Sequence, residues 1–126
     1  MIPAPRHITR VQGWMDVPLH VPEWGNPNGP PILFVHGWSQ AHQSWAHQLG
    51  GVLDQFRLIA PDLRGHGMSG KPEASGHYNA PEPWAADIAN IIATLGLDQP
   101  YLVGWSMGGW VVQDYLSHYG DTGISG

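Results

Sequence analysis

The most informative stretch of this chain is Val103-Gly104-Trp105-Ser106-Met107-Gly108-Gly109, which joins a short apolar run to a segment with helical periodicity. Glycines two residues before and two after a serine, here Gly104 and Gly108, are typical of a very tight strand-to-helix turn, because the strained backbone tolerates only small neighbours. Such a turn raises the Ser106 hydroxyl to a helix N-terminus, whose free N–H groups favour developing negative charge. An ordinary N-cap role is the alternative. The flanking strand and helix favour a nucleophile.

Other short apolar runs have the length and the boundaries of strands. Residues 32–35, 58–60 and 101–103 are continuous apolar runs, and each is followed by a loop containing glycine. Runs of this kind suit strands buried on both faces of a parallel sheet. Segments 8–12 and 18–24, separated by a short turn, predict an antiparallel hairpin.

Helical periodicity separates these strands. Apolar residues fall on one stripe over 83–95 and over 107–119, and more weakly over 43–53, where Gly50 and Gly51 interrupt the pattern. Strands alternating with helices predict an α/β fold with a doubly wound, mostly parallel sheet. Ligands bind to such sheets outside the carboxyl ends of the strands.

Three motifs follow these carboxyl ends in order. They are Phe34-Val35-His36-Gly37-Trp38, Asp62-Leu63-Arg64-Gly65-His66-Gly67-Met68-Ser69 and Gly104-Trp105-Ser106-Met107-Gly108-Gly109. Together they resemble the α/β-hydrolase fold superfamily, in the serine branch that includes esterases and cofactor-free chloroperoxidases. The resemblance covers essentially the whole chain.

The resemblance implies roles for the residues of the first and third motifs. Ser106 would attack an acyl substrate, and the backbone amides of Trp38 and Met107 would form the oxyanion hole. Gly37 would let the backbone turn inward, and His36 would hold neighbouring loops by hydrogen bonds rather than act as a base. No cofactor is implied.

The same resemblance excludes some branches of the superfamily. Relatives that open epoxides or displace halide carry an aspartate at the position of Ser106, and often a proline where this chain has Ser39. The His-Gly-Gly-Pro motif of iminopeptidase-type relatives is absent as well. Carboxylesterases, perhydrolases, lactonases and carbon–carbon bond hydrolases stay open.

A serine nucleophile needs a histidine base and an acid, which follow it in this fold in the order Ser, Asp or Glu, His. The residues after Ser106 include Asp114, His118 and Asp121, of which the first two fall in or at the end of the predicted helix. We therefore expect residues 1–126 to be the N-terminal portion of one domain that stops after this helix, with little turnover of its own. The fifth strand would be an open edge able to pair with another chain. A non-catalytic, partner-binding remnant is the alternative.

Composition excludes several other classes of function. The chain has a net charge of -5 and only five scattered Lys and Arg residues, which disfavours nucleic-acid and anionic membrane partners. It contains no Cys, and its eight His show no metal-ligand spacing backed by acidic residues, so no metal site is predicted. Without a signal-peptide pattern, a cytoplasmic location is expected.

Four further side chains in the motifs have a predicted role in the loops or in a substrate pocket. Asp62 and Arg64 would anchor their loop by charge-assisted hydrogen bonds, although Arg64 could also bind a substrate carboxylate. The positions of Trp38 and Trp105 suggest that they line a substrate pocket.

Overall fold

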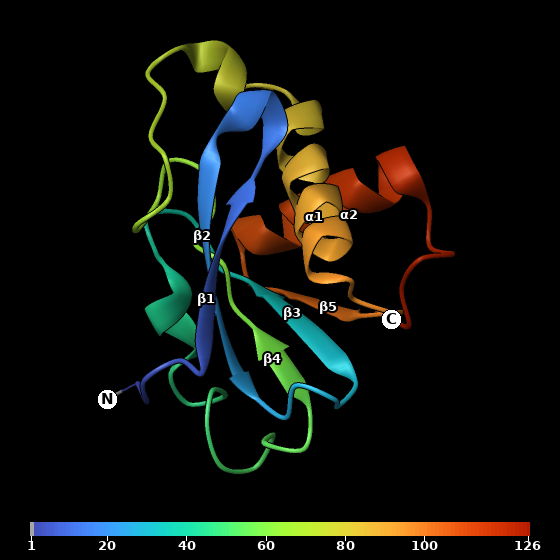
Figure 1. The fold of residues 1–126 in the computed structure, drawn as a ribbon. Helices are drawn as coiled ribbons and strands as arrows, with labels where there is room; N and C mark the ends of the chain where they lie inside the picture. Colours follow the sequence, from blue (N-terminus) through green and yellow to red (C-terminus); the bar gives the residue numbers. More distant parts are fainter. Residues whose placement is uncertain (1) are drawn as a thin grey trace.

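The computed structural model describes residues 2–126, which form one five-stranded sheet with helices packed on it (Figure 1). In chain order the elements are β1 (His7–Gln12), η1 (Trp14–Asp16), β2 (Pro18–Gly25), β3 (Pro31–Val35), η2 (His42–Trp45), β4 (Arg57–Ile59), η3 (Ser75–His77), α1 (Pro81–Leu95), β5 (Tyr101–Gly104) and α2 (Met107–Tyr119), where η denotes a 3₁₀ helix. The predicted hairpin forms β1 and β2, and the three predicted apolar runs form β3, β4 and β5. These predictions are confirmed.

The sheet has the order β1-β2-β4-β3-β5. β3 pairs in parallel with both β4 and β5, whereas β2 is antiparallel to β1 and β4. Four of these strands therefore point the same way, and their carboxyl ends lie at one edge of the sheet. The loops that carry His36, Asp62 and Ser106 leave the sheet at that edge.

Side chains alternate between the two faces of the sheet, as the pleat requires. On β3, Leu33 and Val35 join the core under α1 and α2, while Ile32 and Phe34 join a second core on the opposite face. Residues 45–56 cover that second face with partly buried side chains from Trp45, Leu53 and Phe56. The sheet is thus covered on both sides (Figure 1), as a doubly wound fold requires.

Both long helices lie where apolar periodicity predicts them. α1 begins with Pro81, whose fixed φ suits the first helical position, and ends at Gly96 in the left-handed conformation (φ 61°). α2 has the predicted bounds, and it buries Gly108, Val111 and Tyr115. Neither helix in the described part of the chain is long and apolar enough to cross a membrane.

The predicted helix over 43–53 is wrong. Only one 3₁₀ turn, η2, forms there, and irregular turns continue to Phe56. Leu49 is fully buried, but Gly50 and Gly51 follow it, and Gly51 takes a φ of +81°, which ends any helical path. A segment with so few buried positions gains too little packing to offset the cost of helix nucleation.

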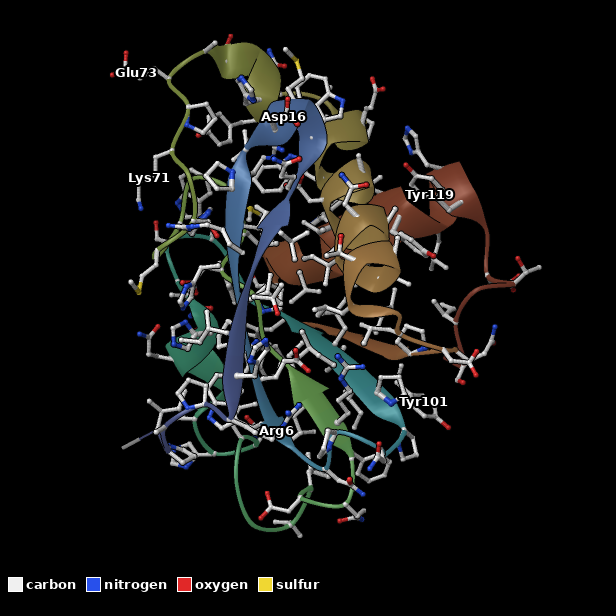
Figure 2. The ribbon with its side chains drawn as sticks, in the orientation of Figure 1. Arg6, Asp16, Lys71, Glu73, Tyr101 and Tyr119 are labelled. Carbon is white, nitrogen blue, oxygen red and sulfur yellow. The ribbon has the colours of Figure 1, made fainter. Side chains whose placement is uncertain are left out.

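β5 occupies the edge of the sheet. Tyr101 and Val103 on it are 42% and 37% exposed, and Figure 2 shows Tyr101 at the periphery of the molecule. The last residues of the chain run along this edge. The Ser125 amide donates to the Pro100 carbonyl (3.0 Å), and the Leu102 amide donates to the Gly126 carbonyl (2.9 Å). The last residues of the chain therefore run in the same direction as β5, as two parallel strands do.

Candidate active site

Ser106 lies in the turn between β5 and α2, in an unusual backbone conformation. Its φ of 56° and ψ of −120° fall outside the regions that side-chain-bearing residues favour. It occupies the N-cap position of α2, but its side chain makes no capping hydrogen bond, and an ordinary N-cap has extended dihedrals. The Ser106 side chain therefore does not cap the helix in the ordinary way. The hydroxyl stands exposed at the helix N-terminus, where the helix dipole favours negative charge.

Two glycines make this turn sterically possible. A Cβ on Gly108 would overlap the Val35 carbonyl oxygen and lie 2.7 Å from the His36 oxygen, and a Cβ on Gly104 would lie 2.7 Å from the backbone of Gly108. The start of α2 can therefore approach β3 this closely only without side chains at both positions. Gly109 has no such neighbour within 4 Å, so the close approach of α2 to β3 depends on Gly108 and not on Gly109.

The loop after β3 lies directly against Ser106. A Cβ on Gly37 would lie 3.2 Å from the Ser106 Cβ and 3.2 Å from the Trp105 carbonyl oxygen. The Trp105 amide donates to the Val35 carbonyl (3.0 Å), which ties the serine turn to the end of β3. Among residues 2–126, neither the Trp38 amide nor the Met107 amide donates a hydrogen bond to another residue. Two free backbone donors therefore flank the serine.

His36 is fully buried and joins two loops. The Leu63 amide donates to its Nε2 (3.0 Å), so Nε2 is unprotonated and Nδ1 carries the hydrogen that it donates to the Gly37 carbonyl (2.8 Å). Burial lowers the pKa of His36 and keeps the ring neutral. With both nitrogens engaged, this histidine has no free atom to act as a base, and it holds the loop before Trp38 in position.

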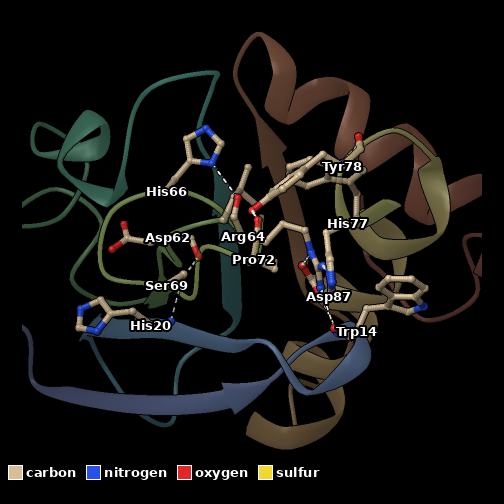
Figure 3. Close-up of polar contacts among 12 residues, drawn as sticks. Trp14, His20, Asp62, Arg64, His66, Ser69, Pro72, His77, Tyr78 and Asp87 are labelled. Atoms are coloured by element: carbon tan, nitrogen blue, oxygen red, sulfur yellow. Dashed lines mark hydrogen bonds and ion pairs between the residues drawn. The ribbon is translucent and has the colours of Figure 1, made fainter. Parts of the chain in front are cut away.

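Arg64 is also fully buried, so the hypothesis that it binds a substrate carboxylate is wrong. Its guanidinium forms a bidentate pair with Asp87 on α1, at 2.6 and 2.7 Å, and also donates to the Trp14 carbonyl (3.0 Å) (Figure 3). Asp87 is not among the residues predicted from the sequence. The signal that could have found it is an acidic residue on the apolar stripe of a helix, between Trp84 and Ile88.

Asp62 anchors its loop through hydrogen bonds, as predicted, and the histidines His20 and His42 lie beside it. It accepts hydrogen bonds from the His42 ring and the His42 amide, both at 2.8 Å, and from the Met68 amide at 2.9 Å. Burial opposes ionisation of this carboxyl, but the bonds from His42 and Met68 outweigh it and lower the pKa of Asp62. Ligand atoms of His20, His42 and Asp62 all lie within 4.8 Å of one another. Spacing along the chain gave no hint of this cluster.

Two pockets flank the serine turn and its neighbouring loop. One has a volume of about 350 Å³ and is lined by Trp38, Ser39, Gly65, His66 and Tyr78. The other, of about 250 Å³, is lined by Gln40, Ser44, Trp45, Gln48 and Trp105. Trp38 and Trp105 each border a pocket, and apolar walls of this kind suit an organic acyl group.

Among residues 2–126, no histidine makes a hydrogen bond to the Ser106 side chain. His118 lies on α2, about 16 Å further along the helix axis than Met107. Its Nδ1 instead approaches the Asp114 carbonyl (3.0 Å), within the same helix. The base and the acid that serine catalysis needs are therefore not found among the described residues.

Comparisons with known proteins identify relatives of this chain. A family model described as "alpha/beta hydrolase fold" matches residues 30–126. The non-heme haloperoxidase of Rhodococcus erythropolis is 39% identical over 99 residues, which cover 78% of this chain and 34% of that protein. Epoxide hydrolase 1 of Caenorhabditis elegans is 34% identical over 103 residues, which cover 82% of this chain and 25% of that protein.

Solved structures give the same result. The crystal structure of a "putative aryl esterase" from Burkholderia cenocepacia superimposes with a TM-score of 0.92 and 44% sequence identity, covering 94% of this chain and 44% of the esterase. The chain thus spans about a quarter to less than half of the length of these relatives. The match in sequence and fold leads to one conclusion: the chain belongs to the α/β-hydrolase fold family.

Proposed function

We propose that Ser106 is the nucleophile of a serine hydrolase that acts on carboxylic esters or related acyl compounds. The observation that carries this proposal is the strained Ser106 turn, with φ 56° and ψ −120°, held against β3 by Gly104 and Gly108. Strain of this kind costs about 1–3 kcal/mol and persists where function requires it. It leaves the hydroxyl exposed and unbonded in front of a helix N-terminus.

In the proposed reaction the Ser106 oxygen attacks the acyl carbon, and the carbonyl oxygen becomes an oxyanion. The free amides of Trp38 and Met107 would stabilise this charge, a contribution of about 3–4 kcal/mol for each donor. The alcohol would leave as the carbonyl re-forms, and water would then hydrolyse the acyl-enzyme. A histidine outside residues 1–126, oriented by an acid, would remove the serine proton and return it to the leaving alcohol.

An ester is favoured over an epoxide because of the side chain at position 106. Similar proteins include epoxide hydrolases, and by the family resemblance those carry a carboxylate nucleophile where this chain has Ser106. Hydrolysis and perhydrolysis share the acyl-enzyme, and a non-heme haloperoxidase is also similar to this chain, so both belong to the proposal. We also propose that residues 1–126 are the N-terminal portion of one domain. The cytoplasmic location expected from the sequence is part of the same proposal.

The test is ester hydrolysis by the natively expressed protein that carries this chain, measured with p-nitrophenyl acyl esters. Ser106→Ala should lower kcat/KM by about 10³-fold or more. Ser117→Ala, at an exposed position on the same helix, should leave kcat/KM unchanged. Equal rates for the wild-type protein and Ser106→Ala would rule out the nucleophile.

A second candidate function is partner binding through the β5 edge, which the exposure of Tyr101 and Val103 favours. An edge strand presents unpaired N–H and C=O groups to another chain, and within residues 2–126 the outer edge at β5 is covered only by the bonds that involve Ser125 and Gly126. A charge at Val103 should weaken such pairing. Val103→Lys should therefore shift an oligomer or complex toward the monomer in analytical ultracentrifugation, and an unchanged distribution would count against this candidate.

A further inference from the structure

Three side chains with metal-binding chemistry converge from segments that are far apart in the sequence. His20 lies on β2, His42 begins η2, and Asp62 follows β4. Each offers one ligand atom, and these atoms lie within 4.8 Å of one another. The His20 and His42 rings are 5.7 Å apart between centroids, and Figure 3 shows the Asp62 carboxylate on the same side of its loop as the His20 ring.

The donor set suits zinc. Two imidazole nitrogens and one carboxylate oxygen are ligands that Zn²⁺ binds at about 2.0–2.2 Å, with water in the fourth position of a tetrahedron. Donors in such a tetrahedron lie roughly 3.3 Å apart, so the most distant pair here would have to close by up to about 1.5 Å. The His20 ring can make this movement, because its side chain makes no hydrogen bond within residues 2–126 and the residue is partly exposed.

The neighbouring bonds already orient the other two ligands. The His42 Nδ1 lies 2.8 Å from Asp62 Oδ1, and the Met68 amide holds the second oxygen of Asp62 at 2.9 Å. Outer hydrogen bonds of this kind fix the ligating groups of metal sites. The His42 side chain is 12% exposed, so an ion has access from solvent while little ligand movement is needed at this pair.

We propose that His20, His42 and Asp62 form a zinc site that fastens the segment after β3 to β2 and to the loop after β4. Zinc would take the place of the hydrogen between His42 Nδ1 and Asp62, and the neutral ring would carry its hydrogen on Nε2. The site does not depend on the assignment of Ser106. Since His42 lies only a few residues after Trp38, bound zinc would steady the loop that carries the proposed oxyanion donor.

The experiment titrates Zn²⁺ into untagged, chelator-dialysed protein by isothermal calorimetry and repeats the thermal denaturation with and without zinc. The wild-type protein should bind one equivalent and denature at a higher temperature with zinc, because a ligand that binds only the folded state stabilises it. His20→Gln should bind at least about tenfold more weakly and lose the zinc-dependent rise in melting temperature. His42→Gln, a second variant that keeps its backbone bond to Asp62, should behave in the same way.

The matched control is His47→Gln, which removes an exposed histidine from the turn after η2 and should bind zinc like the wild-type protein. Without zinc, His20→Gln should denature at the wild-type temperature, since the side chain makes no hydrogen bond that folding would lose. The proposal is overturned if the wild-type protein binds no zinc. It is equally overturned if His20→Gln and His42→Gln bind zinc as tightly as His47→Gln does.

Discussion

Ser106 is held in its strained conformation by backbone contacts rather than by its own side chain. The turn lies between the Val35 and His36 carbonyls on one side and the first residues of α2 on the other. Packing of α2 against β3 therefore maintains the strain, and small neighbours are a condition for that packing. The position of the hydroxyl depends on atoms that never touch a substrate.

The glycines around Ser106 give a sharp test of this account. Gly108→Ala should lower the free energy of unfolding by about 1–3 kcal/mol, because its Cβ would push α2 away from the Val35 carbonyl. Gly109→Ala is the matched control: its Cβ would meet nothing within 4 Å, and alanine should stabilise the helix by up to about 1 kcal/mol. Urea denaturation of both variants measures the difference. Equal effects would show that α2 does not pack as closely as described.

At the scale of elements, one buried ion pair joins three parts of the chain. Arg64 after β4 pairs with Asp87 on α1, and both groups bond to the backbone of Trp14 in η1. The side chains are 0% and 1% exposed, so each charge depends on the other for compensation. The pair fixes α1 relative to the loop that lines the larger pocket.

Removal of one charge from this pair should be strongly destabilising. Asp87→Asn should cost about 3–5 kcal/mol, because it leaves the Arg64 guanidinium buried without a counter-charge. Arg6→Gln, which breaks an ion pair whose arginine side chain is 38% exposed, should cost about 1 kcal/mol or less. Thermal and urea denaturation compare the two variants. A loss at Asp87 no larger than that at Arg6 would contradict the burial of the pair.

The elements were predictable where local pattern and tertiary packing agree. β3, β4, α1 and α2 follow from apolar runs and stripes that the fold then buries, and the Ser106 turn follows from its glycines. The apolar run of β5 also forms a strand, but the expected burial on both faces is wrong because β5 lies at the edge of the sheet. The predicted helix over 43–53 does not form because Leu49 is the fully buried residue of its weak apolar stripe, and one such residue stabilises a helix too little. The approach of His20, His42 and Asp62 depends on strand order, which spacing along the chain does not encode.

At the scale of the whole molecule, buried histidines make stability depend on pH. Burial lowers the pKa of His36 and of His20, so the unfolded chain binds more protons than the folded chain below about pH 6.5. This stabilisation is fully present above the unfolded pKa and is lost as the pH falls through the folded values. Asp62, whose pKa is lowered, adds a further loss only below about pH 4.

The free energy of unfolding in urea should therefore fall between pH 7.5 and pH 5.5. His20→Gln should flatten this decline without abolishing it, because His36 continues to titrate on unfolding. His118→Gln, at an exposed position, is the control with the same change of side chain. A decline that is equally steep in His20→Gln and in His118→Gln would contradict the lowered pKa of the His20 ring in the folded protein.

The edge strand β5 and Ser106 lie on the same side of the molecule. β5 has sheet neighbours only in β3 and the final residues, and Ser106, at the end of β5, is exposed. The chain also spans less than half of the esterase that it superimposes on. We therefore expect the groups that complete the serine site to approach from beyond β5.

Whether Ser106 is an activated nucleophile is measured most directly by the intact mass of the natively expressed protein with and without a fluorophosphonate probe, followed by peptide mapping. Such probes phosphonylate serines that a base has activated. We expect a single adduct, mapped to Ser106 and absent from Ser106→Ala. A protein that gains no adduct, or gains it at another residue, would mean that the Ser106 turn is an inherited shape without the chemistry.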